Sequence, residues 1–181
     1  MKIINMSQAT LTQTKQAAQI LTDNLPNGWP TLKDAMAEIK ERLIPENVML
    51  LVLENERVIG WGGLLKPTYD GNVFELHSLV IHSHYQKQGI GQRLVQKLED
   101  EARKQGGLTI FVGADDDEKE EGETSLSHVD LYEDLPHKLN NFEPGTHQAG
   151  FYFKIGYKII GVMPDANGIG KPDIFLGEKL Y

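Results

Sequence analysis

The sequence predicts a mixed α/β fold: a mostly antiparallel, twisted sheet of about six to seven strands, flanked by about four helices. The first observation is a pair of apolar runs, Val48–Leu53 and Arg57–Leu65, joined by the turn Glu54–Glu56, which is typical of a β-hairpin in the core of a sheet. The second is the strongly amphipathic segment Gly89–Gln105, which indicates a long helix packed on that sheet. The third is a pair of closing strands near the end of the chain: Tyr157–Met163 and Ile174–Leu180.

Shorter signals complete the order of elements. Residues Gln8 to Leu25 are expected to form a helix with Leu11, Ala18, Leu21 and Leu25 on one face. Thr31 can cap a second helix that runs to Leu43, because Asp34 three positions later completes a capping box. The remaining elements are strands at Lys2–Asn5, Val73–Ile81 and Leu108–Gly113, and short helices at Val129–Leu139 and Gln148–Ile155.

The chain has 181 residues with no repeat, low-complexity segment or linker, so residues 1–181 are expected to form one domain. It contains no cysteine, which excludes disulfides, thiolate metal sites and a cysteine nucleophile. No apolar run approaches the roughly 20 residues of a membrane helix, and the N-terminus lacks the apolar segment of a signal peptide. We therefore expect a cytoplasmic protein with no membrane partner.

The net charge of −8 is concentrated in one segment. Between Asp115 and Glu143 there are eleven acidic residues, opposed only by Lys119 and Lys138. Such a segment repels nucleic acid and attracts polycations. A solvated surface loop that keeps the protein soluble is the alternative.

A glycine-rich turn follows the predicted strand Val73–Ile81. Gln86-Lys87-Gln88-Gly89-Ile90-Gly91 opens the long helix, where the first N–H groups have no partner inside the helix and the macrodipole is positive. These features suit a pyrophosphate, although a helix start without a ligand is the alternative. The segment lacks the Lys-Ser or Lys-Thr of a P-loop and the third glycine of a dinucleotide-binding fingerprint.

This unit of strand and Gln-x-x-Gly-x-Gly turn resembles motif A of the GNAT superfamily of N-acetyltransferases. Gly150–Tyr157 is similar to motif B of that superfamily, which follows in the expected order. From about Trp61 onward the chain resembles one branch of the aminoglycoside 6′-N-acetyltransferases, in segments such as Phe74–Ile81, Gly106–Asp116 and Tyr157–Gly168. Ser78 departs from that branch, which usually carries proline there, and the acidic loop is longer.

The resemblance implies that acetyl-CoA is the co-substrate and that a neutral amine attacks its thioester directly. In this interpretation the strand Leu79-Val80-Ile81 offers backbone groups to the pantetheine arm and thioester. The backbone amides of Gln86, Lys87, Gln88, Gly89, Ile90, Gly91 and Gln92 hold the pyrophosphate.

Strand periodicity places residues 75, 77 and 79 on one face, so Glu75 and His77 are expected on the acceptor side, where they would attract the amine and take its proton. An edge-strand charge and a packed histidine are the alternatives. Tyr152 is the candidate general acid for the leaving thiolate, with a place in the aromatic core as its alternative. Trp29 and Asp115 are further candidates for the acceptor pocket, with packing against the core as the alternative for Trp29.

No metal is expected, since His82 and His84 lack a third ligand nearby in the sequence. The predicted function is acetylation of a small cationic amine, most simply the 6′-amine of an aminoglycoside, with antibiotic resistance as the implied role. Acetylation of a protein, a peptide or a polyamine and a non-catalytic acyl-CoA-binding regulator are the alternatives. The resemblance also implies a homodimer, and we expect no nucleic-acid partner.

Overall fold

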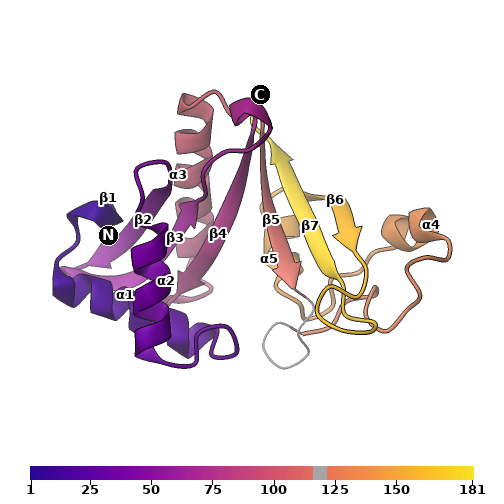
Figure 1. Cartoon of the computed structure of the whole chain (residues 1–181), viewed down its shortest axis with the longest axis horizontal. Helices are drawn as coiled ribbons and strands as arrows, with labels where there is room; N and C mark the ends of the chain where they lie inside the picture. The colour runs from indigo at the N-terminus through magenta and orange to yellow at the C-terminus, as the bar shows by residue number, and fades with distance from the viewer. Residues whose placement is uncertain (116–121) are drawn as a thin grey trace. The chain divides into compact units, whose positions relative to one another are not determined.

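The computed structural model describes residues 1–115 and 122–181, so the part of the acidic segment at 116–121 lies outside the described residues. The fold is mixed α/β and its seven strands are mostly antiparallel, as predicted, with five α-helices in the described ranges (Figure 1). The chain divides into two compact units. The first holds Met1–Ile110 with Leu180–Tyr181, and the second holds Phe111–Lys179.

The sheet of the first unit has the order β1-β2-β3-β4, with every neighbouring pair antiparallel. The predicted hairpin is confirmed: Glu54 pairs with Arg57, and the turn residues Asn55 and Glu56 have φ angles of 48° and 65°. Two positive φ angles are what a tight turn with the twist of its strands requires. The strand bounds are β1 Lys2–Asn5, β2 Val48–Glu54, β3 Arg57–Leu64 and β4 Val73–Ile81.

Two capped helices cover one face of this sheet. In α1 (Leu11–Asn24) and α2 (Leu32–Arg42) a capping box satisfies the first N–H groups, and the Thr31–Asp34 box of α2 is the predicted one. The expected helix start at Gln8 is wrong, because a 3₁₀ turn at Met6–Gln8 comes first. Leu11 then lies in the first turn and is 66% exposed, off the buried face where we expected it.

Trp61 of β3 packs in the core between the sheet and helices α1 and α2. Its ring is fully buried and its Nε1–H donates to the carbonyl oxygen of Ala17 in α1, at 2.9 Å. Small residues on α1, including Ala17 and Ala18, allow this close approach. The α1 and α2 side of the sheet is therefore the side to which Trp61 points.

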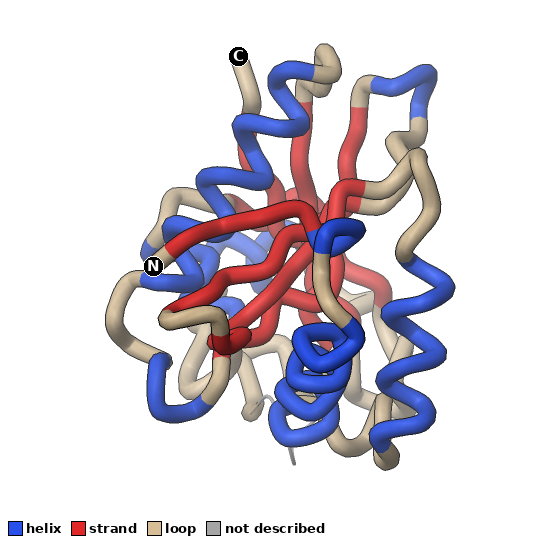
Figure 2. Tube along the Cα trace, turned by 90° about the vertical axis from the view of Figure 1, so that its left-hand side faces the viewer, coloured by secondary structure: helices blue, strands red, loops and turns tan. Residues whose placement is uncertain are grey.

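Helix α3 (Ile90–Lys104) packs on the opposite side of the same sheet (Figure 2). Its buried residues are those that the sequence pattern predicts: Ile90, Leu94, Val95, Leu98 and Ala102. The helix ends before Gly106, whose φ of 83° suits a glycine after a helix C-terminus. The chain then passes through β5 (Thr109–Asp115) into the second unit.

In the second unit β7 (Asp173–Lys179) lies between β5 and β6 (Lys158–Met163). Helix α5 (Ala149–Lys154) is close to its predicted bounds. The predicted helix at Val129–Leu139 is wrong in its first half, because residues 128–134 form turns and bends and α4 covers only Leu135–Asn140. In the described ranges, no helix is both long and apolar enough to cross a membrane.

Candidate active site

Strand β4 carries a bulge in the middle of the predicted motif. Trp61 of β3 pairs with Val80 and Gly63 pairs with His77, so two steps along β3 match three steps along β4. Ser78 lies in this interval with a φ of 54°, in the left-handed region that L-residues avoid. A bulge of this kind leaves an extra residue outside the regular pairing and bends the strand.

The bulge changes which side chains share a face. His77 and Val80 lie on the Trp61 side, where Val80 joins the core under α1 and α2. Leu79 lies on the opposite side, where its Cδ1 comes closest to the position that a Cβ would take on Gly62. The expectation that residues 75, 77 and 79 share one face is therefore wrong for Leu79. It holds for Glu75 and His77, which precede the extra residue.

His77 is held by a carboxylate that the sequence analysis did not identify. Its Nε2 lies 2.9 Å from Oε1 of Glu38, and the Nε–H of Arg42 donates to the same oxygen at 2.7 Å. Glu38 and Arg42 are one turn apart on α2, so a helix start fixed by the capping box presents both to β4. The Trp29 ring lies edge-on to the imidazole, with the centroids 6.5 Å apart. We refer to Trp29, Glu38, Arg42, Glu75 and His77 as the α2–β4 cluster.

Charge pairing within the α2–β4 cluster keeps Glu38 ionised. Burial acts to raise the pKa of the Glu38 carboxyl, but hydrogen bonds from Arg42 and His77 outweigh it, so the pKa lies below its ordinary value. The hydrogen bond to Glu38 raises the pKa of Arg42, and the negative charges of Glu41 and Glu75 add to this. An ionised acceptor at Glu38 means that His77 donates from Nε2, and a neutral His77 then has its lone pair on Nδ1.

The glycine-rich turn presents a row of backbone donors. The N–H groups of Lys87, Gln88, Gly89, Ile90, Gly91 and Gln92 donate no hydrogen bond to any described residue. Lys87 and Gly89 have φ angles of 58° and 77°, and a Cβ on Gly89 would meet nothing within 4 Å. Successive free N–H groups at a helix start form an anion site, and their number fits a pyrophosphate.

Gln86 differs from the six residues that follow it. Its backbone N–H already donates to the carbonyl oxygen of Ser83, at 3.3 Å. Its side-chain Nε2 donates to Oδ1 of Asn24 and to the carbonyl oxygen of Ile81, at 2.9 and 3.0 Å. The side chain thus joins the end of α1 to the end of β4. Asn24, which the sequence analysis did not single out, fixes the turn in place.

Two predicted residues lie in the second unit. Tyr152 on α5 is 4% exposed and its ring contacts those of Phe151 and Tyr157, with centroids 5.0 and 5.5 Å away. Oδ1 of Asp115, at the end of β5, accepts a hydrogen bond from Asn167, at 3.1 Å. Both side chains are thus held in place by partners in their own unit.

His147 connects these two places and was not predicted. It is 3% exposed; its Nδ1 accepts from the N–H of Ala149 at 3.1 Å, and its Nε2 lies 2.9 Å from the carbonyl oxygen of Asp115. A neutral ring protonated at Nε2 satisfies both bonds. One buried side chain therefore joins the end of β5 to the first turn of α5. A histidine two residues before a short helix gives no recognisable signal in the sequence.

The histidines that follow β4 contact one another and not a ligand-binding group in the described residues. His82 uses Nδ1 to accept from the N–H of His84, at 3.3 Å, and its ring packs edge-on against those of His84 and Tyr85. In the described part of the chain, no three His, Asp or Glu side chains lie together in a way that could hold a metal ion.

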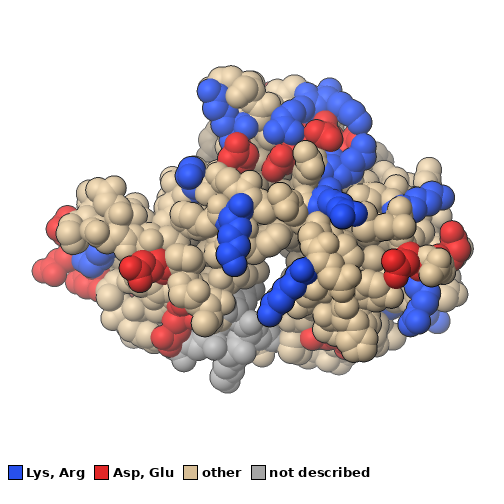
Figure 3. Space-filling model, turned by 180° about the vertical axis from the view of Figure 1, so that it is seen from behind, with Lys and Arg blue, Asp and Glu red and all other residues tan. Residues whose placement is uncertain are grey.

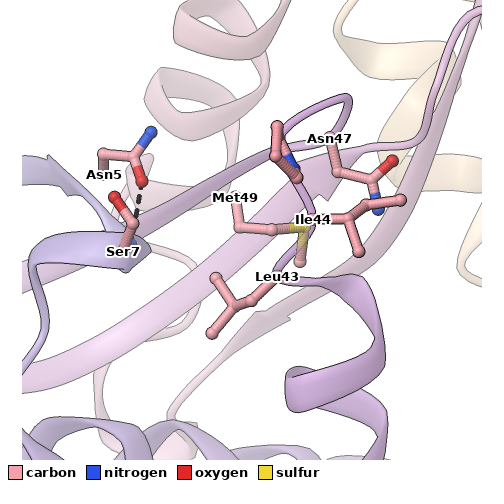
Figure 4. A pocket seen from close by; sticks show the side chains of 7 residues that line it. Asn5, Ser7, Leu43, Ile44, Asn47 and Met49 are labelled. Carbon is pink, nitrogen blue, oxygen red and sulfur yellow. Dashed lines mark hydrogen bonds between the residues drawn. The ribbon is translucent and has the colours of Figure 1, made fainter.

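A pocket of about 330 Å³ lies elsewhere in the first unit, between the start of the chain and the end of α2. Figure 4 shows Asn5 and Ser7 on one side and Leu43, Ile44 and Asn47 on the other. None of its lining residues belongs to the predicted site.

Charges on the surface are unevenly distributed. Figure 3 shows basic and acidic side chains mixed over much of the face turned to the viewer, while acidic ones gather over the region of α4. The described acids of the second unit include Glu123, Asp130, Glu133, Asp134 and Glu143. From Glu123 to Glu143 the acidic residues are therefore part of a charged surface.

Comparisons with known proteins define the class. A sequence model of the GNAT acetyltransferase family matches residues 14–121, more than half of the chain. A crystal structure of an aminoglycoside 6′-N-acetyltransferase complexed with coenzyme A is 34% identical, covers 100% of this chain and 98% of its own, and superposes with a TM-score of 0.91. The aminoglycoside 6′-N-acetyltransferase of Enterococcus faecium gives 33% identity, the same coverage and a TM-score of 0.90.

A GNAT family acetyltransferase from Elizabethkingia anophelis, solved with acetyl-CoA bound, shares the fold at 18% identity and a TM-score of 0.61. No curated protein matches the chain by sequence. The family match and the identity over the whole chain show that this protein belongs to the GNAT family of acetyltransferases. It is thus an N-acetyltransferase whose acetyl donor is acetyl-CoA.

Proposed function

We propose that this protein transfers the acetyl group of acetyl-CoA to the 6′-amine of an aminoglycoside. The observation that carries the proposal is the similarity to two aminoglycoside 6′-N-acetyltransferases, which extends over the whole chain at 33–34% identity. The acidic surface of the second unit supports it, because aminoglycosides carry several positive charges. We further propose that residues 1–181 act as one catalytic domain in the cytoplasm and as a homodimer.

The donor side of the reaction is assigned to the turn after β4. The free N–H groups of Lys87 to Gln92 bind the pyrophosphate of acetyl-CoA, and the backbone of Leu79–Ile81 beyond the bulge receives the pantetheine arm. Tyr152 donates a hydrogen bond or a proton to the departing thiolate.

The acceptor side is assigned to the α2–β4 cluster. The carboxylate of Glu75 attracts the protonated amine, and His77 takes its proton through Nδ1 or through a water molecule. The resulting neutral amine attacks the thioester carbonyl, the C–S bond breaks, and coenzyme A leaves as the thiol. Trp29, whose ring lies edge-on to His77, lines the acceptor pocket.

A thiol-release assay with purified protein and acetyl-CoA tests the acceptor. The panel contains aminoglycosides with a 6′-amine, matched aminoglycosides with a 6′-hydroxyl, polyamines and basic peptides. We expect coenzyme A release only with the 6′-amines, and a single acetyl group at that position by mass spectrometry and NMR. Release with polyamines or peptides alone would assign the protein to another acceptor class. Coenzyme binding with no turnover on any amine would indicate a regulator.

Replacing Glu75 tests the acceptor side directly. Glu75→Gln should lower kcat/KM for a polycationic aminoglycoside by about tenfold or more, because charge attraction and proton transfer are both weakened. The KM for acetyl-CoA should stay within about twofold. The control is Glu56→Gln, which removes the same charge from the exposed turn between β2 and β3. An equal loss in both variants would contradict the assignment.

A further inference from the structure

We infer that Glu38 is a positioning residue of the acetyl-transfer site: its carboxylate fixes the orientation and the protonated nitrogen of His77. The inference rests on the proposed role of His77. It concerns a residue of α2, 39 positions away from His77 in the sequence, and not a group that touches either substrate.

The first support is the geometry of the hydrogen bonds. Oε1 of Glu38 receives the Nε–H of Arg42 at 2.7 Å and faces Nε2 of His77 at 2.9 Å. Arg42 can only donate hydrogen bonds, so it holds the carboxylate in place and leaves the carboxylate as the acceptor for His77. An ionised carboxylate has no proton to donate, so its contact with His77 requires a proton on Nε2.

The second support is burial. The side chains of Glu38 and His77 are 11% and 20% exposed, so both lie largely out of water. A carboxylate in such a place costs free energy unless it is paired, and here it is paired with two donors. Because bulk water reaches it poorly, the hydrogen bond to His77 is a strong restraint on the ring.

The third support is the placement of the other charges around His77. Glu75 lies two residues away on the same face of β4, and Arg42 and Glu41 lie on α2. A His77 fixed by Glu38 at Nε2 keeps Nδ1 as the free basic nitrogen. When Nδ1 takes the proton of the amine, the Glu38 carboxylate stabilises the imidazolium that forms, as a carboxylate does for the histidine of a hydrolase triad.

The test combines kinetics with a spectroscopic readout. Glu38→Gln keeps an oxygen that can accept from Arg42 and His77 but removes the negative charge that stabilises the imidazolium, and it should lower kcat by about tenfold with little change in the KM for acetyl-CoA. The control is Glu41→Gln, which removes the same charge from the same helix at a residue whose side chain is 71% exposed. His77→Asn should show a loss of similar size, and the double variant should be no slower than His77→Asn.

Long-range ¹H–¹⁵N NMR of the full chain reads the imidazole nitrogens directly, with His77→Asn to assign the His77 signals among the six histidines. In the unmodified protein we expect a proton on Nε2 of His77 and none on Nδ1. In Glu38→Ala the difference between the ¹⁵N chemical shifts of these two nitrogens should become smaller. Unchanged shifts in Glu38→Ala would overturn the inference. So would a kcat for Glu38→Gln equal to that of Glu41→Gln, or a further tenfold fall in the double variant. The NMR result needs no acceptor, so it stands even where the aminoglycoside assignment fails.

Discussion

Ser78 determines the backbone conformation of the bulge in β4. Its φ of 54° creates the β4 bulge, and its buried hydroxyl has no hydrogen-bond partner in residues 1–115 and 122–181. Proline, usual at this position in the branch that the sequence resembles, has a φ fixed near −65°. The bulge of this chain therefore has a backbone that proline cannot adopt.

Substitution of Ser78 should change stability in opposite directions. Ser78→Gly should raise the free energy of unfolding by about 1 kcal/mol, because glycine tolerates a positive φ and removes the unpaired hydroxyl. Ser78→Pro should lower it by about 3 kcal/mol or more. Urea unfolding measures both. Ser78→Ala is the control that removes only the hydroxyl, and a gain equal to that of Ser78→Gly would show that the backbone is unstrained.

Because of Glu38, the free energy of unfolding should decrease at acidic pH. The pKa of Glu38 is lower in the folded chain than in the unfolded one, where it is about 4.3. The stabilisation from its ion pairs is therefore present above that pH and is lost as the pH falls through the folded pKa. Between about pH 5 and pH 3 the native protein should lose more unfolding free energy than Glu38→Gln. An equal loss of unfolding free energy in the native protein and Glu38→Gln would contradict the lowered pKa of Glu38. As a control, Glu41→Gln should lose as much as the native protein.

At the scale of elements, local signals predicted most of the fold. The Thr31–Asp34 capping box and the apolar stripe of α3 are contained in short stretches of sequence, and the structure has both. The bulge and the Glu38–His77 contact were missed, because they depend on how β4 pairs with β3 and on where α2 lies. Leu11 was misplaced because the first helical turn can leave an apolar residue in solvent when a cap sets the start.

The junction between β5 and α5 should depend on His147. His147→Ala removes an acceptor for the N–H of Ala149 and a donor to the carbonyl oxygen of Asp115 in a buried place, so we expect a loss of about 2–3 kcal/mol. His147→Asn, whose oxygen can still cap Ala149, should lose less. Thermal unfolding provides the measurement. His137→Ala, at an exposed position on α4, is the control, and an equal loss there would refute a specific role for His147.

At the scale of the whole molecule, the charge of −8 should assist capture of a polycation. Salt shortens the reach of this attraction, from about 10 Å at 0.1 M to about 3 Å at 1 M. The KM for a tetracationic aminoglycoside should therefore rise several-fold over this range. The double variant Glu133→Gln, Asp134→Asn should show a weaker dependence on salt. A KM that does not change with salt would mean that short-range contacts alone bind the acceptor.

The extra residue of β4 also has a consequence for how the gene can vary. A substitution at codon 78 to a residue other than proline leaves the number of residues between His77 and Val80 unchanged, so Glu75 and His77 still point to the side of Trp61. Loss of a single codon there would turn the first half of the strand over. Phe74 and Leu76, now buried, would then take the places of Glu75 and His77. Lineages that keep acetyl transfer should thus tolerate missense changes at this codon, proline excepted, far better than an in-frame deletion.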